Sequence, residues 1–74
     1  MDVLKDTTFM KCKNAVNRPL EINFHDGNDV QRIEPSSIFY VDEVRLAKDK
    51  LATEQFEGYV SDKKIRIIET GVKL

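Results

Sequence analysis

The clearest pattern in the chain is the alternation of apolar and polar residues from Leu20 to Phe24. Leu20, Ile22 and Phe24 occupy every second position, as in a strand that buries one face. An Asp-Gly-Asn sequence follows at positions 26–28, and these residue types tolerate the positive φ angles of hairpin turns. The pattern therefore predicts a β-hairpin whose second strand ends at Ile33.

The apolar residues of the second strand predict its register. A three-residue loop at 26–28 would place Val30 opposite Phe24. The next apolar residue, Ile33, is three positions further on rather than two. We therefore expect a β-bulge at positions 31–32, which returns Ile33 to the buried face opposite Ile22.

A third strand is predicted after the turn at positions 34–37, where proline occupies the second position. It would complete a meander of three antiparallel strands. This strand is apolar on both faces, so it is either central in a closed barrel or in contact with a second surface, such as another subunit. Its residues are the first candidates for an interaction site: Ile38, Phe39, Tyr40 and Val41.

The segments on either side of the meander complete the prediction. Residues 7–16 have the β-branched, aromatic and alternating character of a first strand. Residues 1–6 carry little pattern beyond Val3 and Leu4, which indicates a flexible or docking arm and adds these two residues to the interaction candidates. Positions 42–50 are ambiguous: they could extend the strand, or form a helix with Val44, Ala47 and Leu51 on one face.

A helix and a last strand follow. Thr53 can cap a short helix whose apolar face offers Phe56, Tyr59 and Val60, and Gly58 weakens that helix without forbidding it. The β-branched residues from Ile65 onward predict the last strand, which ends at the glycine of position 71. The expected fold is mainly β (α+β): a small antiparallel sheet or partly open barrel of four to five short strands, with one short helix before the last strand, in a single domain over residues 1–74.

The length of the chain bears on its stability. Its 74 residues allow one core, which at this size leaves about 3–5 kcal/mol of net stability. Cys12 is the only cysteine and His25 the only histidine, so neither a disulfide within the chain nor a structural zinc site is expected. Association with other subunits is the remaining common source of support.

Composition and motifs argue against catalysis and against a strongly basic surface. His25, Asp26 and Asp29 are close in sequence, but turn chemistry explains them better than a general base or a metal site. Ser36 and Ser37 are expected in a turn, and Cys12 is expected to be a small buried hydrophobe. We predict no catalytic residue, no cofactor and no metal. Twelve basic and 13 acidic residues nearly cancel, which argues against nucleic acid as the main partner.

No apolar run approaches the roughly 20 residues that cross a bilayer, and the first residues lack the apolar stretch of a secretory signal. We therefore expect a soluble protein of intracellular origin, with no membrane partner.

Five segments within about residues 14–70 show a recurring order of turns and apolar residues: Asn17-Arg18-Pro19-Leu20-Glu21-Ile22, Ile33-Glu34-Pro35-Ser36, Tyr40-Val41-Asp42-Glu43, Phe56-Glu57-Gly58-Tyr59-Val60 and Lys64-Ile65-Arg66-Ile67-Ile68-Glu69. This order resembles that of small proteins encoded among the structural genes of tailed bacteriophages. What the resemblance implies is a β-rich virion component of a head, neck or tail, made in the host cytoplasm and built into a symmetric ring or attached to a larger shell.

Three hypotheses about function follow. The leading one is a non-enzymatic assembly subunit, a homo-oligomer or a partner of larger virion proteins, acting through residues 38–41 and the arm before Phe9. The second is a regulatory or inhibitory module that binds one host protein and is steered by acidic residues at 42–43, 54 and 57. The third is a small barrel that binds single-stranded nucleic acid through aromatic and basic side chains. Its candidates are Phe9, Lys11, Lys13, Tyr59, Lys63, Lys64 and Arg66.

Overall fold

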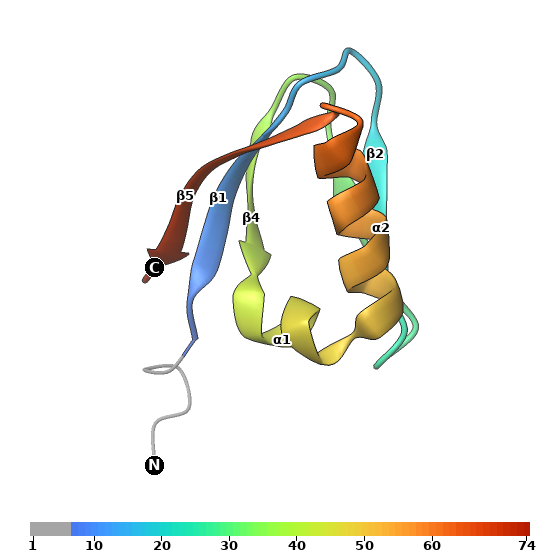
Figure 1. Ribbon diagram of the computed structural model, residues 1–74, viewed down its shortest axis with the longest axis vertical. Helices are drawn as coiled ribbons and strands as arrows, with labels where there is room; N and C mark the ends of the chain where they lie inside the picture. Colours follow the sequence, from blue (N-terminus) through green and yellow to red (C-terminus); the bar gives the residue numbers. More distant parts are fainter. Residues whose placement is uncertain (1–6) are drawn as a thin grey trace.

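The computed structural model describes residues 7–74, which form five strands and two helices (Figure 1). The arm at residues 1–6, with Val3 and Leu4, lies outside the described residues. In chain order the elements are β1 (Phe9–Asn14), β2 (Leu20–Phe24), β3 (Asp29–Ile33), β4 (Ile38–Asp42), α1 (Glu43–Lys48), α2 (Lys50–Ser61) and β5 (Ile65–Val72). The predicted fold class is confirmed: the chain is mostly β, with a helix before the last strand.

The strands form two antiparallel sheets. One has the order β4-β1-β5, and the other is the hairpin of β2 and β3. The sheets do not close into a barrel, and the predicted meander is wrong, because β4 pairs with β1 and not with β3. In this pairing Met10 lies opposite Val41 and Cys12 opposite Phe39. The inward apolar residues of β4 thus meet those of β1, a match that strand order along the chain does not reveal.

The register of the β2–β3 hairpin also differs from the prediction. Phe24 lies opposite Asp29 and Leu20 opposite Ile33, with no bulge between them. Val30 is therefore on the outward side, and its side chain is 49% exposed. The loop has four residues because the turn is held from outside the hairpin: the carboxylate of Asp49 accepts hydrogen bonds from the backbone N–H groups of residues 25 and 26.

The ambiguous segment 42–50 is mostly helical, since α1 covers Glu43–Lys48. Asp42 caps α1, since its Oδ1 accepts hydrogen bonds from the N–H groups of Val44 and Arg45, each 3.0 Å away. The predicted apolar face is wrong, because Leu46 is the residue of α1 that is buried and Val44 is 40% exposed. Helix α1 thus contributes Leu46 to the core.

Helix α2 is longer than expected and begins earlier. Its cap is Asp49, not Thr53, which lies inside the helix and donates its hydroxyl hydrogen bond to the carbonyl of Leu46. The predicted apolar face is confirmed: Phe56 is buried, and residues 59 and 60 pack against the core. The capping carboxylate and this apolar face together fix the helix against β2.

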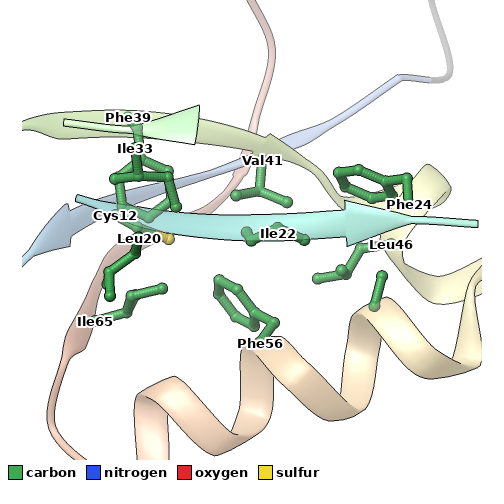
Figure 2. Close-up of a cluster of buried hydrophobic side chains, with 11 residues drawn as sticks. Cys12, Leu20, Ile22, Phe24, Ile33, Phe39, Val41, Leu46, Phe56 and Ile65 are labelled. Atoms are coloured by element: carbon green, nitrogen blue, oxygen red, sulfur yellow. The ribbon is translucent and has the colours of Figure 1, made fainter. Parts of the chain in front are cut away.

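The core lies between the β4-β1-β5 sheet, β2 and α2. In Figure 2, Phe39 and Val41 project from β4, Ile22 from β2 and Phe56 from α2 toward the same interior. β1 is shorter than the predicted 7–16, since it ends at Asn14. β5 continues through Gly71, whose φ of +68° accompanies an irregularity in its pairing with β1.

Candidate interaction surface

The β4-β1-β5 sheet has one face toward the core and one face away from it. Met10 and Cys12 of β1 belong to the core, so the alternating residues between and beside them point outward. Residues paired across the strands share a face, which extends the outward set to β4 and β5. We call this surface the outer face; its members are Phe9, Lys11, Lys13, Ile38, Tyr40, Asp42, Arg66, Glu69 and Val72.

The interaction candidates of β4 divide between the two faces of this sheet. Phe39 is 9% exposed and Val41 is fully buried, whereas Ile38 is 55% and Tyr40 38% exposed. A central position in a closed barrel is ruled out, because β4 is at the edge of a three-stranded open sheet. Within residues 7–74, nothing packs over the exposed apolar side chains of the outer face; the contact of β4 with a second surface stays a prediction.

Positive charge gathers beside these apolar residues. Lys13 lies directly opposite Arg66, and Lys11 lies opposite Glu69. Among the described residues no ion pair involves Lys11, Lys13 or Arg66. Like charges directly across a sheet destabilise it. A negatively charged group placed beside Lys13 and Arg66 would offset their repulsion and stabilise the sheet. Both side chains line a hollow of about 220 Å³.

The two edges of the sheet differ. The outer edge of β4 is partly covered, because the Gln31 side chain donates a 2.8 Å hydrogen bond to the carbonyl of Tyr40. No described strand pairs with the outer edge of β5. β5 carries two irregularities in its register with β1, and such bulges make an edge a poor template for a further strand. The faces of the sheet are therefore better placed than its edges to bind a partner.

Two apolar hollows lie on the other side of β5, against α2. One has a volume of about 380 Å³ and is lined by residues that include Val60 and Ile65. The other, about 320 Å³, is lined by residues that include Met10 and Phe56, and Ile67 belongs to both. Charged side chains border both hollows: Lys63 and Arg66 line the first, and Glu43 and Glu57 line the second.

The residues of the His25–Asp29 turn form a structural cluster. Arg45 Nη2 lies 3.1 Å from Asp26 Oδ1, and Arg45 Nη1 lies 3.2 Å from Asp29 Oδ2. The hydrogen bond from Arg45 lowers the pKa of the Asp26 carboxyl. The guanidinium also stacks on Phe24, 4.2 Å from the ring centre. The turn interpretation is confirmed, and Arg45 joins this turn to α1.

Asp49 is a second member of this cluster that the sequence prediction missed. Its side chain is nearly buried, and its Oδ1 accepts a 3.1 Å hydrogen bond from the N–H of Ala52. This bond, with those from the N–H groups of residues 25 and 26, lowers the pKa of the carboxyl. Aspartate is a preferred cap, so its place before the apolar pattern of α2 was the signal that could have identified it.

Asn14 is the other buried polar residue within positions 7–74, and no sequence signal points to it. Its side chain is fully buried at the end of β1. Nδ2 donates hydrogen bonds to the carbonyls of Arg18 (2.8 Å) and Glu34 (3.1 Å), and Oδ1 accepts one from the N–H of Val16 (3.0 Å). One amide therefore ties two loops together at the end of the sheet.

The remaining candidates for chemistry have structural roles. Cys12 is fully buried as predicted, and burial, with a smaller contribution from Glu43, raises the pKa of its thiol to about 11. The Ser37 hydroxyl donates a 2.7 Å hydrogen bond to the carbonyl of Glu34, as expected in a turn. Within residues 7–74 no three His, Cys, Asp or Glu side chains gather in a way that could hold a metal ion. None of the helices there is long and apolar enough to cross a bilayer.

Neither a family model, nor a curated protein, nor a solved structure matches this chain. The outer face combines the exposed apolar side chains of Ile38 and Tyr40 with the basic side chains of Lys13 and Arg66.

Proposed function

We propose that the protein is a non-enzymatic assembly subunit that binds other protein subunits through its outer face. The resemblance to small structural proteins of tailed bacteriophages supports a virion as the assembly. The subunit would then be made in the host cytoplasm and taken into a head, neck or tail.

The exposure of Ile38 and Tyr40 carries the proposal. Both side chains stand on a sheet face that no described element covers, at 55% and 38% exposure. Burying a large apolar side chain contributes about 1.5–3 kcal/mol when its full area leaves water. Tyrosine is among the residues most enriched in energetically important contacts between proteins. A partner on this face would also supply a small domain with burial that its own core lacks.

Ile38→Asp tests the proposal. We expect this variant to sediment as a monomer at concentrations at which the wild type associates, because a charged side chain at the centre of an interface loses its hydration. Val30→Asp is the matched control: Val30 is an exposed β-branched residue of the other sheet, at 49% exposure. Association lost equally in both variants, or in neither, would argue against the outer face, provided that their circular dichroism is that of the folded wild type.

The same face favours one alternative function. Phe9 and Tyr40 occupy neighbouring strands beside Lys11, Lys13 and Arg66, and small β domains bind single strands by combining stacking rings with basic groups. Tyr59 does not join them, since its hydroxyl donates to the carbonyl of Glu21 on β2. A single-stranded oligonucleotide bound with an affinity that falls steeply as salt is added would favour this function over protein assembly.

The regulatory alternative gains less from the structure, because only two of its four acidic residues, Glu43 and Glu57, line a common hollow. Asp42 caps α1, and the Glu43 carboxylate accepts a 2.8 Å hydrogen bond from the N–H of Gly71. Glu54 and Glu57 lie on α2, which packs on the core side of the sheet. A single stoichiometric host partner, captured independently of the outer face, would support it.

A further inference from the structure

The structure carries a second charged surface, along the exposed side of α2. Successive residues of an α-helix turn by about 100°, so Leu51, Glu54 and Gly58 lie on the side opposite the buried Phe56. Glu57 lies between this side and the core, because it also lines the hollow of about 320 Å³ with Phe56. Leu51 is 56% exposed. Lys50 is on the same side, and no ion pair among the described residues involves Glu54 or Glu57. We call Leu51, Glu54, Glu57 and Gly58 the acidic helix face.

We propose that the outer face of one copy of this chain binds the acidic helix face of the next copy. This inference rests on the proposed assembly function and names the partner as a second copy. Lys13 and Arg66 would approach Glu54 and Glu57, and Leu51 would pack against Ile38 and Tyr40.

The two faces carry complementary groups, since among the described residues neither the basic pair of Lys13 and Arg66 nor the acidic pair of Glu54 and Glu57 takes part in an ion pair. On the outer face, Lys13 and Arg66 repel one another across the sheet. The carboxylates of this face do not neutralise them: Glu69 lies opposite Lys11, and Asp42 lies opposite Phe9 at the far end of the strands, where it caps α1. An opposing pair of carboxylates would relieve this repulsion and steer the encounter of the two copies.

The positions of the two faces decide the symmetry of the contact. Figure 2 places the core between β4, from which Phe39 and Val41 project, and α2, from which Phe56 projects. The outer face and the acidic helix face therefore point away from each other, so one copy cannot satisfy its own charges. Contact between two outer faces would set two surfaces that each carry Lys13 and Arg66 against one another, whereas contact with the acidic helix face brings these basic side chains to carboxylates. The complementary pairing joins different surfaces of the two copies and is therefore head-to-tail, a contact that closes into a ring or continues as a filament.

Charge reversal on each face separately tests the contact. We expect Lys13→Glu with Arg66→Glu, and separately Glu54→Lys with Glu57→Lys, to weaken association by about tenfold or more, because each places like charges across the interface. Sedimentation velocity at low ionic strength measures this effect, and circular dichroism melting confirms that each variant is folded. Arg18→Glu with Lys48→Glu changes two exposed residues outside both faces by the same total charge as the reversal of Lys13 and Arg66, and this control should associate as the wild type does.

The decisive variant carries all four reversals in one chain. It keeps the wild-type net charge of −1, and a head-to-tail contact predicts that it regains the wild-type assembly, since each face still meets its opposite. If the variant with four substitutions stays dissociated, or if either variant with two substitutions assembles as the wild type does, the inference is overturned. Self-association of the chain would still stand. A wild type that is monomeric throughout, and binds an oligonucleotide through Lys13 and Arg66, overturns both this inference and the proposed function.

Discussion

Asn14 is expected to be one of the residues on which the stability of this fold depends most. Its amide is fully buried where β1 ends, and it makes three hydrogen bonds to the backbone of two loops. Asn14→Ala removes all three and leaves two carbonyls and one N–H group without this partner. A hydrogen bond of this kind contributes about 1 kcal/mol net, so we expect the free energy of unfolding to fall by about 3 kcal/mol.

That loss would be large for a chain of this size, whose net stability is expected to be about 3–5 kcal/mol. Urea unfolding followed by far-ultraviolet circular dichroism measures it, at a protein concentration at which the chain is monomeric. The Asn14→Ala variant should unfold at the lowest urea concentrations, with part of the population unfolded before any urea is added. The slope of the transition should be unchanged, because the fold itself is the same.

Asn17→Ala is the control, since Asn17 lies in the same loop but is exposed and makes no hydrogen bond through its side chain. We expect it to lie within about 0.5 kcal/mol of the wild type. The reasoning would be refuted if Asn14→Ala came within about 1 kcal/mol of Asn17→Ala, a margin equal to one ordinary hydrogen bond.

Asn14→Asp extends the test to pH. The carboxylate would face the carbonyl oxygens of Arg18 and Glu34, which raises its pKa in the folded state. A raised folded pKa means that the stability of this variant is recovered below the ordinary carboxyl range and lost as the pH rises through the folded value. The variant should therefore be closer to the wild type in acid than at neutral pH, and the opposite trend would contradict the assigned hydrogen bonds.

Three further predictions concern other single residues. Gly58→Ala should raise the free energy of unfolding by about 0.5–1 kcal/mol, because a methyl group there meets open space and alanine favours a helix, and urea unfolding measures it. Asp49→Asn should lower the melting temperature at pH 7 and lower it less in acid. The pKa of the Asp49 carboxyl is lowered in the fold, so the stability it contributes is present above the unfolded value and lost as the pH falls; an equal loss at both pH values would contradict this. The Cys12 thiol, with its pKa near 11, should react with a disulfide reagent at pH 8 slowly in the folded chain and fully in urea, and complete labelling on mixing would contradict its burial.

The amino-acid sequence alone determined those features that local periodicity encodes. The alternation from Leu20 to Phe24 predicted a strand with the right residues buried, and the spacing of Phe56 and Tyr59 predicted the inward side of α2. Cys12 was placed in the core because small apolar side chains are usually buried. Two of the four apolar residues of β4 lie outside the core, on the uncovered face that this strand's pattern suggested.

Tertiary structure alone decided how these elements pair. β4 could have paired with β3 or with β1, because both offer an apolar inner side, and the choice of β1 depends on contacts between segments about 30 residues apart. The register of the hairpin depends on its loop, which the carboxylate of Asp49 holds by hydrogen bonds from another part of the chain. It does not depend on the spacing of the apolar residues Val30 and Ile33, from which the sequence predicted it. The outer face was likewise hidden in the sequence: Lys13 and Arg66 become neighbours only when β1 and β5 pair, since periodicity reports which side a residue faces and not which strand lies beside it.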